Sequence, residues 1–543
     1  MTRKIITAAL PYVNNLPHLG NIVGSLLSAD VYNRYCKMRG ISTVFITGTD
    51  EYGTASEVSA DKAGLSPQEL CDINSAKHKE VYDWFQINYD IFGRTSMDRH
   101  KEITQSIFLE MYNNGYFIER EEERYFCSGC NMFLADRYIN GTCSICGSDN
   151  ARGDQCDGCS AILAIDEIIN PYCSTCKSVP VKKMTKHLFF ELNKVQDKLN
   201  QLIEEYSINW SSVARQVSND WKNKELIPRC ITRDLKYNWG VPVPLPEYKD
   251  KVLYVWFDAP IGYITFTDIL GKRDWWTESD VQLCEFMGKD NVFFHSVFFP
   301  GMLVGCNQIK YPNLISATHY LTYEGDKFSK SMGRGIFGSD LLGDRIGCAG
   351  AWRFHLMRRR PETGDADFLW REFKESYNTI LINTIGNLCN RVLSYVKKRL
   401  NGTLTTPKLD SDTVQSINTV LNKYINHMDK AEIRSAIECI VNVAGMGNLY
   451  VQKAFAEKVD KNEMGIRISS AINILVIIGK MLYPVVPKEG DELLSILKID
   501  DRTIPNEFTE ELSDGYTIGD VHILFHPLTD AQAQAMETFC CNL

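Results

Sequence analysis

The sequence has no long hydrophobic run, no excess of positive charge and no low-complexity or repeated segment. Its most apolar run, Ala471–Gly479, is far shorter than the roughly 20 residues that span a bilayer, so we expect no membrane partner. The net charge of −9 gives no general attraction for nucleic acid. We therefore expect no DNA partner, and an RNA partner only through local basic patches.

A targeting segment is also missing ahead of the first apolar stretch, because MTRKIITAALPY begins an apparent strand at once. We therefore expect a cytoplasmic protein. Nor are the 18 cysteines arranged as in a secreted disulfide scaffold. In a chain of 543 residues without a leader, they indicate metal binding in a reducing compartment.

Eight of these cysteines form four C-x-x-C knuckles, in which a tight turn lets both thiolates face one metal ion. Two knuckles complete a tetrahedral zinc site, and four sulfurs leave no position for a reactive water, so we predict two structural sites. A redox role is disfavoured because a redox C-x-x-C is usually solitary. The shorter closure joins the middle two knuckles and leaves the outer two together: Cys143/Cys146 with Cys156/Cys159, and Cys127/Cys130 with Cys173/Cys176.

Residues 1–117 alternate strand and helix patterns, as in a parallel α/β fold. Lys4–Leu10 reads as a buried strand that Pro11 ends, and a helix follows Asn21 and stops at Gly40. His18 therefore lies on a polar turn at a helix N-terminus, which is suited to binding an anion such as a triphosphate. Taken alone, such a turn is more often an ordinary surface loop.

Two acidic residues follow predicted strands, at the edge where parallel sheets bind ligands. Asp50 follows the strand at 44–46, although it or Glu51 is also placed to cap a helix beginning near Thr54. Asp290, in Gly288-Lys289-Asp290, follows the strand Leu283–Met287. Because strand and helix patterns resume at 283–319, an insertion at about 118–227 is expected to split the sheet.

The remaining patterns predict helices, an aromatic loop and a basic loop. Helical spacing covers 186–227 and the long segments from 371 to 487, and 521–525 is strand-like. Tyr254–Asp258 is predicted to be a strand that turns into a Pro-Ile-Gly loop. Gly325–Gly333 holds K-F-S-K-S, whose lysines are able to close over a triphosphate, although alone it is an ordinary solvated turn.

The order of these motifs resembles the class I aminoacyl-tRNA synthetases, whose two signatures are usually written HIGH and KMSKS. More narrowly, ALPYVNNLPHLGN, VWFDAPIGY, GKDNVFFHS and GDKFSKS resemble blocks of the methionyl-tRNA synthetases. The resemblance covers nearly the whole chain. HLGN, KFSKS and four knuckles are similar to the archaeal and eukaryotic cytosolic branch.

The resemblance implies that methionine attacks the α-phosphate of ATP, with Mg²⁺, and that the methionyl group then passes to the 3′ adenosine of tRNA(Met). The implied catalytic residues are His18, Asn21, Lys327 and Lys330. Those for ATP are Pro11, His18, Gly20, Asn21, Gly288, Asp290 and Lys330. Those for methionine are Leu10, Tyr12, Asp50, Trp256, Ala259, Pro260, Tyr263, His295 and Phe299, with Asp50 pairing the ammonium group.

The resemblance also implies a bundle that reads the anticodon through Asn387 and Arg391. The family commonly has a tryptophan after Asn-x-Tyr in a later helix, but here Asn448-Leu449-Tyr450 is followed by Phe455 and no tryptophan. The run Arg358–Arg360 is a candidate for contacts with tRNA phosphates.

The predicted fold is therefore a Rossmann-like parallel-sheet catalytic domain, split by a zinc-knuckle connective insertion and followed by an all-α anticodon-binding bundle. The expected boundaries are catalytic halves at 1–117 and 228–322, the insertion at 118–227 with knuckles at 127–176, the lysine-loop region at 323–370, and the bundle with its tail at 371–543. We expect either a monomer or a member of a synthetase complex.

Two other functions fit part of the pattern. One is another class I synthetase, although the chain is short for the isoleucine, leucine and valine enzymes and its aromatic pocket argues against cysteine. The other is a noncatalytic zinc-knuckle RNA-binding protein of synthetase shape, against which the intact HLGN and KFSKS motifs argue. Exchange of pyrophosphate into ATP, tested across the twenty amino acids, separates all three.

Overall fold

We analysed a computed structural model of the chain. It describes residues 2–134, 138–153, 156, 158–159, 163, 167–308, 310–328, 334–342, 347–455 and 459–541.

The centre of the molecule is a parallel five-stranded sheet in the order β14-β13-β1-β2-β3. Its three middle strands are buried along most of their length, which fits their apolar, β-branched sequences. The sheet confirms the predicted α/β class, and the insertion separates its first three strands from its last two. Their bounds are β1 Arg3–Ala8, β2 Ser42–Thr49, β3 Ile91–Arg94, β13 Val281–Gly288 and β14 Pro312–Thr318.

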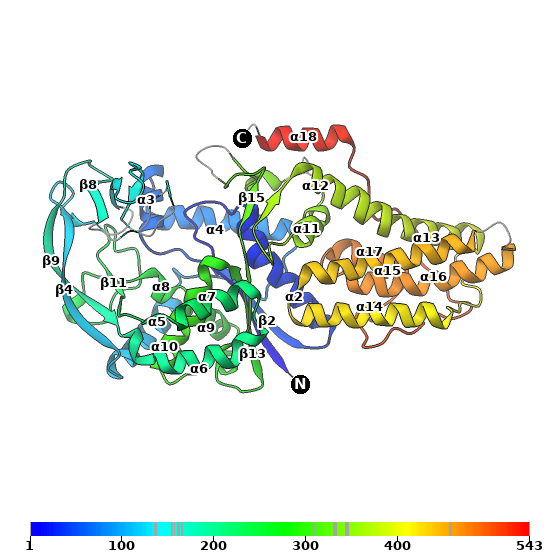
Figure 1. The fold of residues 1–543 in the computed structure, drawn as a ribbon, viewed down its shortest axis with the longest axis horizontal. Helices are drawn as coiled ribbons and strands as arrows, with labels where there is room; N and C mark the ends of the chain where they lie inside the picture. The colour runs from blue at the N-terminus through cyan, green and yellow to red at the C-terminus, as the bar shows by residue number, and fades with distance from the viewer. Residues whose placement is uncertain are drawn as a thin grey trace.

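Helices cover both faces of this sheet (Figure 1). The predicted helix after Asn21 consists of α1 (Leu19–Asn21), a π-helix (Ile22–Leu26) and α2 (Leu27–Met38), and Gly40 follows at φ +69°. Three further helices continue the first half: α3 Thr54–Ala63, α4 Pro67–Trp84 and α5 Asp98–Asn113. The second half adds a π-helix at Phe294–Phe298 that runs into α10, Phe299–Gly305.

The predicted strand and loop at 254–263 are wrong. This stretch forms α8 (Val255–Asp258) and the start of α9 (Ile261–Ile269), after a two-residue strand β12 (Val252–Leu253). The first seven residues of α9 are all buried, so the sequence shows no amphipathic helical period there. Aromatic and β-branched residues then suggest a strand.

The insertion is an antiparallel sheet, β10-β9-β4-β5, that carries a smaller sheet with the order β7-β6-β8 (Figure 1). Of the helical pattern predicted at 186–227, α6 (Gln196–Tyr206) and α7 (Ser212–Lys222) are confirmed, whereas residues 186–190 belong to strand β9. The strands are β4 Phe117–Cys127, β5 Met132–Phe133, β9 Val181–Phe190, β10 Arg229–Cys230, β6 Ile139–Cys143, β7 Ala151–Arg152 and β8 Ile168–Cys173.

A helical bundle forms the other end of the elongated molecule (Figure 1), as predicted. Its helices are α12 Trp370–Lys374, a π-helix Glu375–Gly386, α13 Asn387–Arg399, α14 Ser411–Asp429, α15 Ile433–Ala454, α16 Lys461–Leu482, α17 Pro487–Ile496 and α18 Asp530–Cys541. The strand-like 521–525 forms no strand. Within the described residues α16 alone is long and apolar enough to cross a bilayer, but 89% of its apolar window is buried.

The bundle and the catalytic domain share one hydrophobic core. Helix α11 (Ala349–Arg358) lies between them and contributes Trp352 and Phe354 to that core. The buried Arg353 guanidinium contacts both sides: it donates to Asp30 Oδ2 on α2 at 2.7 Å and to the Val485 carbonyl, just after α16, at 2.7 Å. The bundle is therefore firmly packed against the face of the sheet that α2 covers.

Candidate active site

A cleft of about 540 Å³ opens beside the carboxyl end of β1, between the His18 turn and the loop that follows β14. This is the edge of a parallel sheet where ligands usually bind. The structure brings nine of the predicted binding residues to its walls: Leu10, Pro11, Tyr12, His18, Gly20, Asn21, Trp256, Gly288 and Asp290.

His18 caps the N-terminus of α1. Its Nδ1 accepts a hydrogen bond from the Gly20 N–H at 3.1 Å, and its own N–H donates to Asn21 Oδ1 at 3.1 Å. Burial lowers the pKa of His18 to about 4, so the ring is neutral near pH 7. Because Nδ1 accepts, the proton of the neutral ring lies on Nε2, which can donate to an anion. Asn21 is exposed and keeps its amide donors.

The His18 turn pairs with a segment more than 300 residues away in the sequence. The Gly338 N–H donates to the Pro17 carbonyl at 2.7 Å, and the Leu19 N–H donates to the Ile336 carbonyl at 3.2 Å. The Phe328 ring stacks on the His18 imidazole with centroids 4.5 Å apart. Phe328, which the sequence did not single out, therefore fixes the start of the K-F-S-K-S loop against the HLGN turn.

That loop holds two lysines predicted to be catalytic, Lys327 and Lys330. Lys327 is exposed beside Phe328. Lys330 lies outside the described residues, so its predicted contact with phosphate stays a prediction.

Asp50 follows β2 and is only 2% exposed. Its Oδ1 has no hydrogen-bond partner among the described residues, and its N–H and carbonyl bond to the Pro11–Val13 loop. Burial, and then the nearby Asp258 and Glu51 carboxyls, raise the pKa of Asp50 well above its ordinary value. A buried carboxyl with one unbonded oxygen fits an organic ammonium ligand. Neither it nor Glu51 caps α3 through its side chain; Glu51 accepts from Arg94 instead.

Aromatic rings form a continuous group behind the cleft. Trp256 stacks on Phe294 at 3.6 Å and meets the edge of Tyr12 at 6.0 Å. Farther in, Tyr263 Oη lies 2.9 Å from His295 Nε2, and both side chains are buried. His295 Nδ1 lies 2.8 Å from the Asn291 carbonyl and so carries the proton, which leaves Nε2 to accept from the tyrosine.

The other predicted methionine residues join this group. Ala259 and Pro260 immediately precede α9, and Phe299 lies 6.3 Å from the Tyr263 ring. This aromatic group is apolar apart from the Tyr263–His295 pair, a composition that suits a polarizable thioether. The residues that line the cleft do not include Asp50, Ala259, Pro260, Tyr263, His295 or Phe299.

Tyr320 is a further cleft residue that the sequence did not indicate. Its hydroxyl donates to Asp290 Oδ1 at 2.6 Å, and the Lys289 ammonium lies 3.8 Å from its ring centroid. Lys289 also pairs with Asp365 at 3.3 Å. These contacts hold Asp290 at the cleft wall, and no local sequence pattern signals them because the partners come from three loops.

The bundle offers a separate surface around Arg391. Asn387 is exposed at the start of α13, and the Arg391 guanidinium lies 5.4 Å from the centroid of the Phe455 ring, which is 44% exposed. Phe455 thus lies beside the predicted anticodon residues. In contrast, the predicted tRNA contact of Arg360 is wrong, because this side chain is 1% exposed and donates to Ser28 and Ser316.

The cysteine knuckles form two groups of four, paired as the shorter closure predicts: Cys127, Cys130, Cys173 and Cys176, and Cys143, Cys146, Cys156 and Cys159. Within each group all sulfur atoms lie within 4.8 Å of one another, and the Cys130 and Cys173 sulfurs are 3.9 Å apart. A tetrahedral site with zinc–sulfur bonds near 2.3 Å requires sulfurs roughly 3.8 Å apart, so both groups fit zinc.

The fold and the cleft define a class I aminoacyl-tRNA synthetase. The family model described as tRNA synthetases class I (M) matches residues 4–393, and the model described as the anticodon binding domain of methionyl tRNA ligase matches residues 402–540. The chain belongs to the methionyl-tRNA synthetase family.

Individual relatives agree. A probable cytoplasmic methionine–tRNA ligase of Encephalitozoon cuniculi is 43% identical over 99% of this chain and 98% of the relative. The cytoplasmic methionine–tRNA ligase of Saccharomyces cerevisiae is 40% identical over 97% of this chain and 72% of the relative. The methionyl-tRNA synthetase of Mycobacterium tuberculosis, bound by methionyl-adenylate, has the same fold, with a TM-score of 0.78 over 97% of this chain and 100% of that chain, at 22% identity.

Proposed function

We propose that the cleft binds ATP along the HLGN turn and methionine at its aromatic end, with Asp50 between them. The chain is a methionine–tRNA ligase: it joins methionine to ATP as methionyl-adenylate, releases pyrophosphate, and transfers the methionyl group to tRNA(Met). The observation that best supports this assignment of sites is the buried Asp50 carboxyl, whose Oδ1 has no hydrogen-bond partner among the described residues, close to the neutral aromatic group. A free amino acid brings an ammonium group to such a carboxyl.

In this proposal little covalent work falls to the protein, and positioning and charge stabilisation carry the reaction. His18 Nε2–H, the Asn21 amide and the N-terminus of α1 donate to the phosphates. Asp290, held by Tyr320, accepts from the ribose hydroxyls. Lys327 and Lys330 neutralise the charge that develops on pyrophosphate, with Mg²⁺ bound to ATP.

The proposed metal is zinc, one ion in each group of four cysteines. Four thiolate ligands complete each site, so the metal would hold the knuckles together and take no part in the chemistry. The outer group clamps the end of β4 to the end of β8, and so shapes the tip of the insertion.

The bundle is proposed to bind the anticodon of tRNA(Met) through Asn387 and Arg391. Phe455 supplies an exposed aromatic face beside Arg391, and splayed bases stack on such faces. The location is cytoplasmic, like that in the names of the relatives. The proposed domain boundaries are those expected from the sequence: 1–117, 118–227, 228–322, 323–370 and 371–543.

Amino-acid-dependent exchange of pyrophosphate into ATP tests the activity, and His295→Ala tests the pocket. Exchange is expected with methionine among the twenty amino acids. His295→Ala is expected to raise the KM for methionine while the KM for ATP changes little, because His295 belongs to the aromatic group that we assign to methionine. An unchanged methionine KM would remove His295 from the site, and exchange with no amino acid would favour the RNA-binding alternative.

A further inference from the structure

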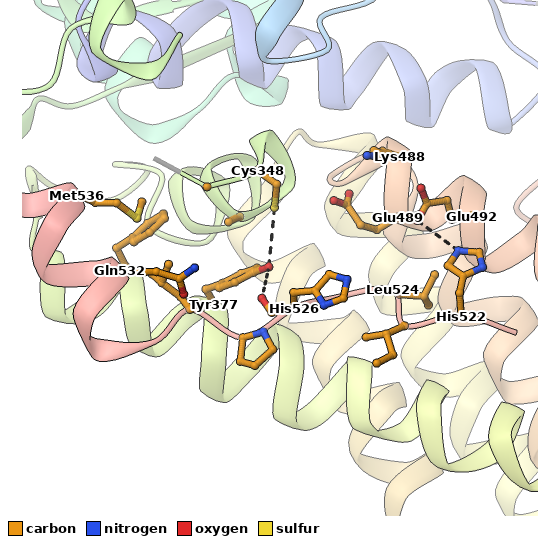
Figure 2. Close-up of a pocket in the computed structure, with 16 residues that line it drawn as sticks. Cys348, Tyr377, Lys488, Glu489, Glu492, His522, Leu524, His526, Gln532 and Met536 are labelled. Atoms are coloured by element: carbon orange, nitrogen blue, oxygen red, sulfur yellow. Dashed lines mark hydrogen bonds and ion pairs between the residues drawn. The ribbon is translucent and has the colours of Figure 1, made fainter. Parts of the chain in front are cut away.

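A second cavity, of about 400 Å³, shares no lining residue with the cleft and lies where α11 meets the bundle and its C-terminal segment. Its walls come from α11, α17, the π-helix after α12, and the C-terminal segment that ends in α18 (Figure 2). Its volume is in the range of small-molecule sites, and it has room for about a dozen waters. None of the predicted synthetase residues lines it.

The cavity has an apolar middle and an acidic wall. Phe373, Ala351 and Met536 line it and are at most 3% exposed. Helix α17 lines the cavity with two glutamates, Glu489 and Glu492, and one lysine, Lys488, so the net charge of these side chains is negative. Apolar walls of this kind favour an organic ligand over a network of ordered water.

Glu489 is the group that points to a ligand. Its side chain lines the cavity, it is 5% exposed, and its Oε2 has no hydrogen-bond partner among the described residues. Burial raises the pKa of Glu489, and this effect outweighs the opposing effects of its own backbone N–H, Lys488 and Arg353. By contrast, the neighbouring Glu492 carboxylate already lies 3.8 Å from His522 Nε2 (Figure 2).

We propose that this cavity is a second ligand site, which binds a small organic cation with an apolar body. The ammonium group would lie against Glu489, and the apolar body would pack between Phe373 and Met536. At the other end, the Cys348 thiol and the Tyr377 hydroxyl lie 3.8 Å apart and offer weak polar contacts.

The site lies between two parts of the molecule, α11 and the bundle, that pack against each other. Ala351 lies on α11, which also carries the Arg353 contact to α2, whereas Glu489 belongs to the bundle. A bound ligand would therefore stabilise the packing of the bundle against the catalytic domain. It would raise the unfolding temperature without occupying the cleft.

The test uses the full chain with 2-phenylethylamine as the probe and the neutral 2-phenylethanol as its matched control, followed by ligand-observed NMR. The amine is expected to bind about tenfold more tightly than the alcohol, and Glu489→Gln to abolish this difference, because a charge-assisted hydrogen bond is lost. Ala351→Leu, which fills the cavity and keeps the carboxyl, is expected to weaken both compounds. Glu463→Gln, on α16 away from the cavity, serves as the control variant.

Saturating methionine distinguishes this site from Asp50 in the cleft. Binding of the amine is expected to persist with methionine present, and Glu489→Gln is expected to leave methionine-dependent exchange unchanged. Equal affinity for amine and alcohol, binding lost on adding methionine, or an unaltered preference in Glu489→Gln would each overturn the proposal. None of these outcomes bears on the synthetase activity itself.

Discussion

Replacing Asp50 with asparagine tests the proposed ammonium contact while keeping the shape of the side chain. Loss of one member of a buried, hydrogen-bonded charge pair costs about 2–5 kcal/mol, or roughly 30- to 5,000-fold in binding. In the wild-type protein part of this attraction is offset at any pH below the raised pKa of Asp50, because there a proton must first leave the carboxyl. We therefore expect the lower part of that range, a loss of about 30- to 300-fold in kcat/KM for methionine.

The pH dependence of methionine binding also tests the Asp50 contact. Below its raised pKa the Asp50 carboxyl of the free protein is protonated, and an ammonium ligand favours the ionised form. Methionine binding therefore releases a proton, and its affinity should rise with pH by up to tenfold per unit until the pH exceeds that pKa. Asp50→Asn should remove this slope.

Pyrophosphate exchange between pH 6 and 8.5 measures both effects, with 4-(methylsulfanyl)butanoate, which lacks the amino group, as a competing ligand. Asp50→Asn should weaken methionine while leaving inhibition by this analogue nearly unchanged. If methionine and the analogue lose equal affinity, or if the pH slope survives in the variant, Asp50 does not contact the ammonium group.

Three further results are expected. Glu285 is fully buried, both of its carboxyl oxygens lack hydrogen-bond partners among the described residues, and burial raises its pKa. The wild-type protein should therefore lose stability as the pH rises from the pKa of the unfolded state towards that of the folded state, and the urea midpoint of Glu285→Gln should exceed the wild-type midpoint by a growing margin between pH 6 and 9. Parallel plots of urea midpoint against pH for the two proteins would contradict this. Arg353→Ala removes one of the two buried guanidinium groups on Asp30, the other being that of Arg34, and should cost about 1.5–3 kcal/mol in urea unfolding. Arg467→Ala, at an exposed pair, should cost at most about 1 kcal/mol, and equal losses would refute the interpretation. Metal analysis should return two zinc ions per chain, and a chelator should reduce protection of the insertion from proteolysis; one ion would mean that one knuckle pair is vestigial.

Local patterns predicted those parts of the fold whose signals are themselves local. The four knuckles pair as their spacing suggests, and β1, α2 and the long bundle helices follow from apolar period and from breakers such as Gly40. Helix α9 was missed because it is buried on nearly every side, so its sequence carries no polar face to reveal a period of 3.6. Residues 186–190 of β9 could not be separated by sequence from the helical pattern that begins soon after them.

The candidate site was predictable only where a residue belongs to a motif that can be read in one stretch. His18 and Asp50 meet this condition, since each follows a strand of the sheet at its carboxyl end. Tyr320 and Phe328 do not, because their roles depend on which loops meet in space. The burial of Arg360 could not be predicted either, since a run of three arginines gives no sign that one of them is buried against Ser28 and Ser316.

Irregular helices adjoin each proposed binding surface, and this connects local backbone with function. Within the described chain, π-helical segments occur directly after Asn21, around His295 and directly before Asn387. Such segments are rare and occur often at functional sites, because the extra residue in a turn redirects the side chains around it. A regular α-helix in place of such a segment would rotate the residues after it about the helix axis. Sequence periodicity assumes regular helices, so it can place these residues near a ligand but cannot give the direction in which they point.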